Sequence, residues 1–426
     1  MSTPQALLKG SPSTPNAWPA LALRDFTARG KKYSIVDGPF GSNLKTIHYR
    51  LSGIPIVTSG FVTSGSFHAN AYLYVDERKF NQEIRSAVYP GDIVMAKIGA
   101  RCGASAILPH DHPTGILSGN ALKISIDETR HSTEYVALVL RWLYERGSLE
   151  ILRSTGAQPA ISMPLLKRLE LPCPPLPVQR EIATTVADAD SLIVALERWI
   201  AKKQAIKRGM MQELLTGKTR LTGFAEQWRV KPLGDLTTIV SGGTPRTAVP
   251  SYWNGGIPWC TPTDITGEAG RYLSRTERTI SREGLDQSGA QLLPVGSLLL
   301  CTRATIGEVK IAVVPTATNQ GFKSLVPLPG ISSEFLYYTV LTLKDELASK
   351  GTGSTFLEVS KRDVAALELK VPALDEQSAI AEVLADADDE IDLLKRRLGK
   401  AIAMKTGMMQ ELLTGRIRLR VDEAAV

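Results

Sequence analysis

The sequence of 426 residues contains only four cysteines, and they form no C-x-x-C pair. This scarcity excludes a disulfide framework and argues against a structural zinc site, so we expect free thiols in a reducing cytoplasm. Long apolar runs are also missing, because stretches such as Leu298–Cys301 are far too short to span a bilayer. The N-terminal residues lack the basic and apolar regions of a signal peptide, and we expect no membrane association.

Motifs for cofactor and metal chemistry are equally scarce. There is no Asn/Asp-Pro-Pro-aromatic motif and no glycine-rich loop for S-adenosylmethionine, and all five histidines precede residue 132. The stretch LLTGKT (Leu214–Thr219) is no phosphate-binding loop, because that motif requires glycine where this chain has Gln212. The stretch VDERKF (Val75–Phe80) resembles a nuclease cluster only loosely, and a charged surface strand is the simpler interpretation. We therefore expect no catalytic centre, no metal and no bound cofactor.

A long internal repeat is the main positive feature of the sequence. Residues Pro174–Leu221 align with Pro372–Leu419 without gaps, and 26 of 48 positions are identical. In both copies the apolar residues recur at alternating spacings of four and three, which is a heptad seam, although Lys203 and Lys207 interrupt the first copy. A narrow apolar seam needs a partner helix, and the chain itself supplies a matching one. The pattern predicts two long helices that pair as an antiparallel coiled coil.

The two remaining segments are strand-rich and faintly related to each other. "GIPIVTSGFV" (Gly53–Val62) resembles "GIPWCTPTDI" (Gly256–Ile265), and "PGDIVMAKIGARCG" (Pro90–Gly103) resembles "PVGSLLLCTRATIG" (Pro294–Gly307). Short β-branched runs between turn residues predict strands, and one late helix is expected in each segment. We predict an α+β protein of two globular domains, residues 1–175 and 222–372, which alternate with two helical repeats, residues 176–221 and 373–426.

This arrangement resembles the specificity subunit of type I restriction–modification enzymes over nearly the full length. The resemblance rests on the alternation of two domains with two helical repeats, on the Pro-x-x-x-Gln-x-x-Ile start of the first helix (Pro175–Ile182) and on its Leu-Leu-Thr-Gly end. It implies a non-catalytic subunit whose domains each read one half of an asymmetric, bipartite double-stranded DNA site. It also implies two methyltransferase subunits bound to the helices, motor–nuclease subunits that join them, and S-adenosylmethionine, ATP and Mg²⁺ on those partners.

The helical repeat has a length that suits such a site. A helix from about Gln179 to Leu214 would span roughly 50 Å at about 1.5 Å per residue. Domains joined by such a rod could reach major grooves about one helical turn, roughly 34 Å, apart. Charge gives weaker support, since the chain carries a net charge of +7, which leans toward the first domain.

Loops that combine small and amide residues with isolated basic ones are the candidate DNA contacts, because they allow close approach to phosphates and bidentate contacts to base edges. In the first domain these residues are Gly41, Ser42, Asn43, Lys45, Ser59, Lys97, Arg101, Asn120 and Gln158. In the second domain they are Ser241, Gly242, Gly243, Thr244, Arg246, Thr261, Asp264, Arg303, Asn319, Gln320, Ser354 and Thr355. The alternative is that the glycines are plain turn residues and that the basic side chains are merely solvated.

Two other functions remain open at this point. The chain could be a self-sufficient nuclease or methyltransferase with an unusual active site, which activity of the purified chain would support. It could also be a pseudo-symmetric DNA-binding scaffold or regulator without any modification enzyme, which a neighbouring methyltransferase gene would argue against.

Overall fold

The computed structural model describes residues 18–28, 33–39, 41–154, 158–352 and 357–419. The chain divides into two compact units, and each unit combines a strand-rich domain with parts of both long helices. Unit 1 consists of residues 1–194 and 399–426, and unit 2 of residues 195–398. In the described residues no helix is both long and apolar enough to cross a membrane.

In the domain of unit 1 the described residues form four small sheets and three α-helices. The four-stranded sheets have the orders β6–β3–β10–β7 and β2–β11–β8–β9, and β1–β12 and β4–β5 are two-stranded. The strands are β1 (Ala20–Ala22), β2 (Ile35–Asp37), β3 (Ile54–Val57), β4 (Val62–Thr63), β5 (Ser66–Phe67), β6 (Tyr74–Val75), β7 (Ala87–Val88), β8 (Ile93–Ala96), β9 (Ser105–Ile107), β10 (Gly115–Leu117), β11 (Ala121–Ile124) and β12 (Glu170–Pro172). The helices are α1 (Glu77–Gln82), α2 (Thr133–Glu145) and α3 (Met163–Lys167).

The domain of unit 2 repeats this plan with a longer sheet. Its sheets have the orders β14–β21–β18–β19–β16, β17–β15–β20 and β13–β22. The strands are β13 (Arg229–Pro232), β14 (Thr237–Ser241), β15 (Trp253–Cys260), β16 (Tyr272–Leu273), β17 (Thr279–Ile280), β18 (Leu298–Leu300), β19 (Val309–Ala312), β20 (Ala317–Thr318), β21 (Lys323–Pro327) and β22 (Glu368–Val371). The helices are α5 (Leu233–Leu236), α6 (Pro262–Gly267), α7 (Arg282–Asp286), α8 (Ser333–Thr342), α9 (Lys344–Ser349) and α10 (Lys361–Ala365). The predicted α+β class is confirmed.

The strand pairing confirms that the two domains are related. The parallel pair β3·β10 in unit 1 corresponds to the parallel pair β15·β20 in unit 2. The antiparallel order β2–β11–β8–β9 corresponds to β14–β21–β18–β19. One local prediction is wrong: the stretch Val75–Phe80 is mostly helix α1, not a surface strand, because Asp76 caps the backbone N–H of Lys79.

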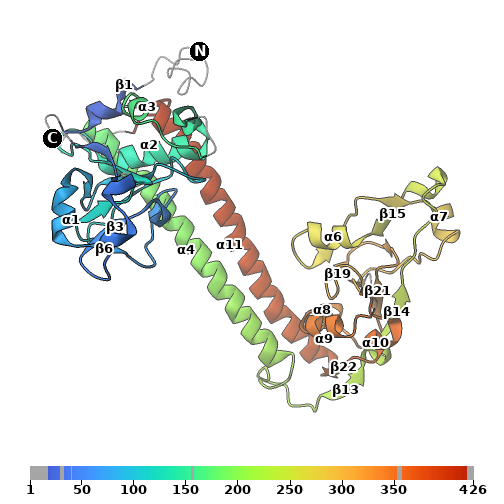
Figure 1. The fold of residues 1–426 in the computed structure, drawn as a ribbon. Coiled ribbons are helices and arrows are strands. Elements are labelled where there is room, and N and C mark those ends of the chain that lie inside the picture. Colours follow the sequence, from blue (N-terminus) through green and yellow to red (C-terminus); the bar gives the residue numbers. More distant parts are fainter. Residues whose placement is uncertain (1–17, 29–32, 40, 155–157, 353–356, 420–426) are drawn as a thin grey trace. The chain divides into compact units, whose positions relative to one another are not determined.

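The two repeats form the long helices α4 (Leu176–Leu214) and α11 (Leu374–Thr414) (Figure 1). Helix α11 ends directly before Gly415 (φ 75°), and α4 ends three residues before Gly217 (φ 71°). This left-handed conformation is favourable for glycine and stops a helix.

The helices pack against each other in opposite directions, as predicted. In unit 1, Lys405 of α11 contacts Asp190 of α4 at 2.5 Å. In unit 2, Lys207 of α4 contacts Asp388 of α11 at the same distance. These two pairs are equivalent in the repeat, so the lysines that interrupt the seam form cross-helix ion pairs.

The start of each helix is fastened to its domain by one buried glutamine. Gln179 accepts a hydrogen bond from the N–H of Ser132 (3.0 Å) and donates one to the carbonyl of Pro174 (2.8 Å). Gln377 makes the equivalent bonds with Ser332 (2.9 Å) and Pro372 (3.0 Å). Gln179 of the Pro-x-x-x-Gln-x-x-Ile pattern and its counterpart Gln377 therefore both have a structural role.

Each unit has one main core that joins domain and helices. In unit 1, Ile182 and Val186 of α4 and Leu412 of α11 pack with the buried face of α2. In unit 2, Ile380 and Leu384 of α11 occupy the matching places beside α8. Burial of aliphatic side chains at about 25 cal/mol per Å² makes these contacts the main attachment of each domain to its helices.

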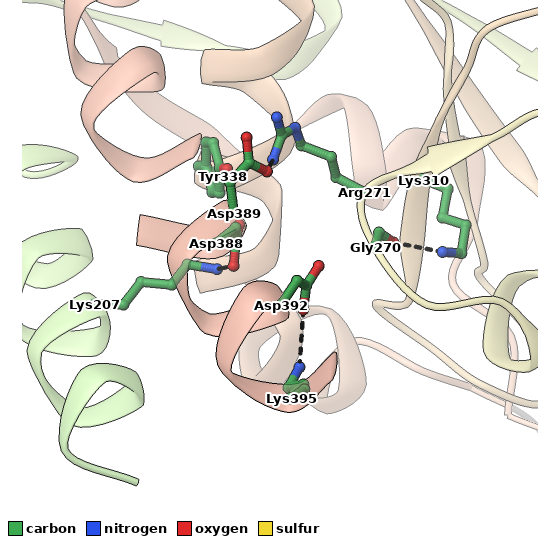
Figure 2. A network of polar contacts seen from close by, with 9 residues as sticks. All are labelled: Lys207, Gly270, Arg271, Lys310, Tyr338, Asp388, Asp389, Asp392 and Lys395. Carbon is green, nitrogen blue, oxygen red and sulfur yellow. Dashed lines mark hydrogen bonds and ion pairs between the residues drawn. The ribbon is translucent and has the colours of Figure 1, made fainter. Parts of the chain in front are cut away.

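A polar network completes the attachment in unit 2 (Figure 2). Asp388 accepts hydrogen bonds from Lys207 of α4 and from the hydroxyl of Tyr338 of α8 (2.8 Å). The neighbouring Asp389 pairs with Arg271 of the domain at 3.0 Å. In unit 1, Asp190 is held by Arg141 at 3.0 Å as well as by Lys405. Burial alone would raise the pKa of Asp190, but the hydrogen bonds from these two cations hold it below its usual value.

The network involves acidic residues beside the heptad seam. From the sequence alone, such residues would be taken as solvated helix faces or as contacts to partner subunits. Asp190, Asp388 and Asp389 instead form ion pairs inside the chain.

Candidate nucleic-acid interface

In unit 1 the predicted contact loops of Ser59, Asn120 and Gln158 lie together at one edge of the domain. The N–H of Ser59, after β3, donates to the side-chain oxygen of Asn120 at 3.3 Å. The N–H of Lys97, after β8, donates to the carbonyl of Asn120 at 2.8 Å. The N–H of Gly99 donates to the carbonyl of Pro159 at 3.1 Å, which brings the loop of Gln158 to the same edge.

The exposed side chains at this edge are those of Arg101, Asn120 and Gln158. They combine a cation with two amides, the groups that contact phosphates and base edges in the predicted way. Gly41 and Asn43 lie in a short 3₁₀ turn with Ser42, and Asn43 and Lys45 are exposed.

Lys97, predicted as a DNA contact, is buried and forms an ion pair inside the domain. Its side chain is only 8% exposed, and its Nζ lies 2.6 Å from a carboxylate oxygen of Asp37. The charge therefore serves inside the domain, where it holds the end of β2 against the turn after β8. We do not carry Lys97 forward as a direct DNA contact.

In unit 2 the loop Ser241–Arg246 lies against the turn before β21. The N–H of Gly243 donates to the carbonyl of Thr318 at 2.9 Å, and the side chains of Thr244 and Gln320 are hydrogen-bonded. Ser241, Thr244, Arg246 and Gln320 are exposed. This edge presents hydroxyls, an amide and a cation together.

Other predicted residues of unit 2 lie around Gly321. A Cβ on Gly321 would lie 3.1 Å from Oδ1 of Asn319 and 3.7 Å from Cβ of Arg303. Arg303 is half-buried, and the hydroxyl of Thr261 contacts the carboxylate of Asp264 at 2.7 Å. Ser354 and Thr355 lie outside the described residues.

Asp264 has a structural position. Its two oxygens accept from the N–H and hydroxyl of Thr261 and from the N–H of Glu277, at 2.7–2.8 Å. It caps α6 and is already satisfied by three donors, so we do not carry it forward as a base contact.

The sequence analysis named Gly242 but missed Gly38, its counterpart at the edge of unit 1. A Cβ on Gly38 would lie 2.0 Å from the carbonyl oxygen of Ser118, and one on Gly242 would lie 1.9 Å from that of Asn319. Each glycine also donates its N–H to the next strand, to Ala121 or to Phe322. The signal was available, because the segments "DGPFG" (Asp37–Gly41) and "SGGTP" (Ser241–Pro245) occupy the same place in the two domains.

The registers of the parallel strand pairs show which residues of the two edges are equivalent. Leu117 faces Val57 and Thr318 faces Cys260, so Ser118 corresponds to Asn319 and Asn120 to Gly321. The two edges therefore share backbone geometry but present different side chains at equivalent places.

The buried cysteines offer no nucleophile at these edges. Burial raises the pKa of the Cys301 thiol to about 12, and it raises that of Cys260 as well. Among the described residues, no group of three or more His, Cys, Asp and Glu side chains is placed to hold a metal ion. What the edges do present is neutral hydrogen-bonding groups and cations.

Comparison with known proteins gives a consistent family. Residues 46–208 and 225–402 match the type I restriction modification DNA specificity domain. Two curated relatives come from Methanocaldococcus jannaschii. The MjaIX specificity subunit is 37% identical over 182 residues, which is 42% of each chain. The MjaVIII specificity subunit is 23% identical over 428 residues, which covers 95% of this chain and 94% of that one.

Solved structures share the fold over almost the full length. The HsdS subunit from Thermoanaerobacter tengcongensis superposes with a TM-score of 0.52 at 19% identity, covering 96% of this chain and 99% of that chain. The S subunit from M. genitalium superposes with a TM-score of 0.57 at 14% identity, covering 94% and 97%.

Proposed function

This chain belongs to the specificity subunits of type I restriction–modification enzymes and has two target recognition domains, and we propose that each domain reads one half of a bipartite, asymmetric site in double-stranded DNA. The observation that carries the proposal is the shared loop edge with different side chains. Gly38 and Gly242 hold the same close turn in both domains, whereas Asn120 of one edge corresponds to Gly321 of the other. Two domains with the same backbone geometry but different side chains at equivalent places are suited to two different half-sites.

We assign the DNA contacts to residues of the candidate loops in both domains. In unit 1 we assign Gly41, Ser42, Asn43, Lys45, Ser59, Arg101, Asn120 and Gln158. In unit 2 we assign Ser241, Gly242, Gly243, Thr244, Arg246, Thr261, Arg303, Asn319, Gln320, Ser354 and Thr355. Glycines allow the backbone to approach phosphates, and the amide and guanidinium groups contact base edges.

We assign partner binding to the two helical repeats. Twenty-six of 48 aligned positions are identical, so the chain offers the same helical surface twice. Two equivalent surfaces fit two copies of one partner. We therefore propose that two methyltransferase subunits bind there and that motor–nuclease subunits join this core. S-adenosylmethionine, ATP and Mg²⁺ belong to those partners, and the complex acts on DNA in the cytoplasm.

A genome-wide map of methylated adenines in the host, with and without this gene, tests the proposal. The expected result is the loss of one motif made of two short halves around a fixed gap. An unchanged map in a host that expresses an adjacent methyltransferase gene would contradict it and would favour a DNA-binding regulator without a modification enzyme.

A further inference from the structure

Unit 2 holds one arginine against a pair of tryptophans. The guanidinium carbon of Arg278 lies 3.7 Å from the ring centroid of Trp253 and 5.3 Å from that of Trp259. The two indole rings meet edge to face, with centroids 5.1 Å apart and an interplanar angle of 85°. A guanidinium that lies over an indole face gains cation–π and stacking energy, and it loses freedom of orientation.

Both indole rings are tied to a loop already assigned to DNA contact. Trp259, only 3% exposed, donates its Nε1–H to the carbonyl of Gly243 at 2.9 Å. Trp253 donates its Nε1–H to the carbonyl of Arg246 at 3.3 Å. The stacked arginine and the Ser241–Arg246 loop are therefore parts of one rigid assembly.

The backbone of Arg278 is fixed as well. Its carbonyl accepts from the N–H of Trp259 (3.1 Å) and from the hydroxyl of Thr276 (2.6 Å). A bulge in β15 lets both Trp253 and Ile257 face Ile280 of β17. Such bulges re-aim side chains, and here the bulged strand carries Trp253 to the arginine.

The N–H groups at the edge of the Arg278 guanidinium form no ion pair with any described carboxylate. Arg278 is exposed. Its neighbours differ, because Arg275 pairs with Glu268 at 3.0 Å and Arg282 with Asp286 at 3.2 Å. Stacking occupies the face of the guanidinium and leaves its in-plane N–H groups available.

We propose that Arg278 reads a guanine in the half-site of the second domain, through paired hydrogen bonds to O6 and N7. A planar fork held in one orientation matches the two acceptors of guanine in the major groove, and this pairing is the commonest specific contact of arginine with DNA. A phosphate contact needs charge but no fixed plane, so the stacked geometry favours the base. The inference rests on the proposed function of this domain.

The test compares adenine methylation in cells that carry the wild-type gene or Arg278→Lys in place of it, together with the intact partner genes. The lysine keeps the charge but loses the fork. We expect one G·C position of the second half of the motif to become degenerate, with discrimination at that position reduced by about tenfold or more. The letters of the first half and the gap should remain unchanged, which shows that the complex still folds and assembles.

Each other outcome overturns the inference in a recognisable way. A uniform loss of methylation that keeps every letter of the motif would indicate a phosphate contact. An unchanged map, or a second half without any G·C pair, would also contradict it. If the wild-type gene directs no split motif at all, the proposed function fails instead. Arg282→Lys is the matched control, because Arg282 is exposed and pairs with Asp286 of α7, and it should leave all letters intact.

Discussion

At the scale of single residues, His131 is the clearest point where the units differ. Its side chain is 4% exposed and packs on Phe26 with ring centroids 4.5 Å apart. Its Nδ1 faces Gln179 at 3.4 Å, while Nε2 is buried without a partner among the described residues. The equivalent residue before the N-cap serine of α8 is Ile331, so the same place also accommodates an aliphatic side chain.

The burial of His131 predicts that unit 1 loses stability at acidic pH. Burial lowers the pKa of His131, and the positive charge of Arg130 lowers it further. The unfolded chain takes up a proton below about pH 6.5 whereas the folded unit does not, so stability falls as pH decreases, by at most about 1.4 kcal/mol per pH unit. His131→Ile should remove this loss and leave stability at pH 8 equal or higher, measured by urea unfolding of the full chain at pH 5.5 and 8.

The control for this prediction is His110→Gln. His110 is exposed, so this variant replaces a histidine outside the core of unit 1. If His131→Ile and the wild type lose the same stability between pH 8 and 5.5, the buried histidine is not the cause.

At the scale of elements, the hydrogen bonds of one buried glutamine attach the start of each long helix to its domain. Gln377 is 1% exposed and bonds the N–H of Ser332 and the carbonyls of Pro372 and Gly330. Gln377→Met keeps the volume but leaves these buried groups unpaired, at about 1–3 kcal/mol for each group. We expect unit 2 to lose about 2–4 kcal/mol and the Ser332 amide to exchange hydrogen faster, as measured by urea unfolding and hydrogen exchange.

A matched substitution on the other helix separates this effect from a general change in helicity. Gln212 is exposed on α4, and Gln212→Met should alter stability by less than about 0.5 kcal/mol. Equal effects of the two substitutions would show that the fastening bonds contribute little.

The helices were the most predictable elements, and the loop edges the least. Periodicity and Gly217 define the end of α4, because a helix depends on local spacing and local caps. The fastening role of Gln179 and the burial of Lys97 depend on Ser132 and Asp37, which are 47 and 60 positions away. No local pattern carries such pairings, so the sequence could not separate structural cations such as Lys97 from exposed ones such as Arg101.

At the scale of the whole molecule, domains and helical repeats alternate, so the order of the segments along the chain is nearly circular. Trp18, at the start of the first domain, donates its Nε1–H to the carbonyl of Leu412 at 2.8 Å, and Arg418 stacks over its ring. In unit 2, Arg220 stacks over the ring of Trp228 in the same way. The Nε1–H of Trp228 donates to the carboxylate of Glu376 at 3.0 Å. The equivalent of Glu376 is Val178, which explains why Trp18 uses a helix carbonyl. Each helix end is thus closed by the domain that follows it in this circular order.

The helix pair also predicts how the gap of the DNA site depends on length. Deleting Leu196–Trp199 removes four residues from α4 alone, which shifts the heptad seam out of phase with α11. We expect the original split motif to lose its methylation while both domains stay folded.

Deleting one heptad from each helix, residues 195–201 and 393–399, preserves the phase and removes about 10 Å of rise. That variant should methylate the same two halves at a gap about three base pairs shorter, as read from a genome methylation map. Unaltered methylation at the original gap in both variants would show that the helices do not set the distance between the half-sites.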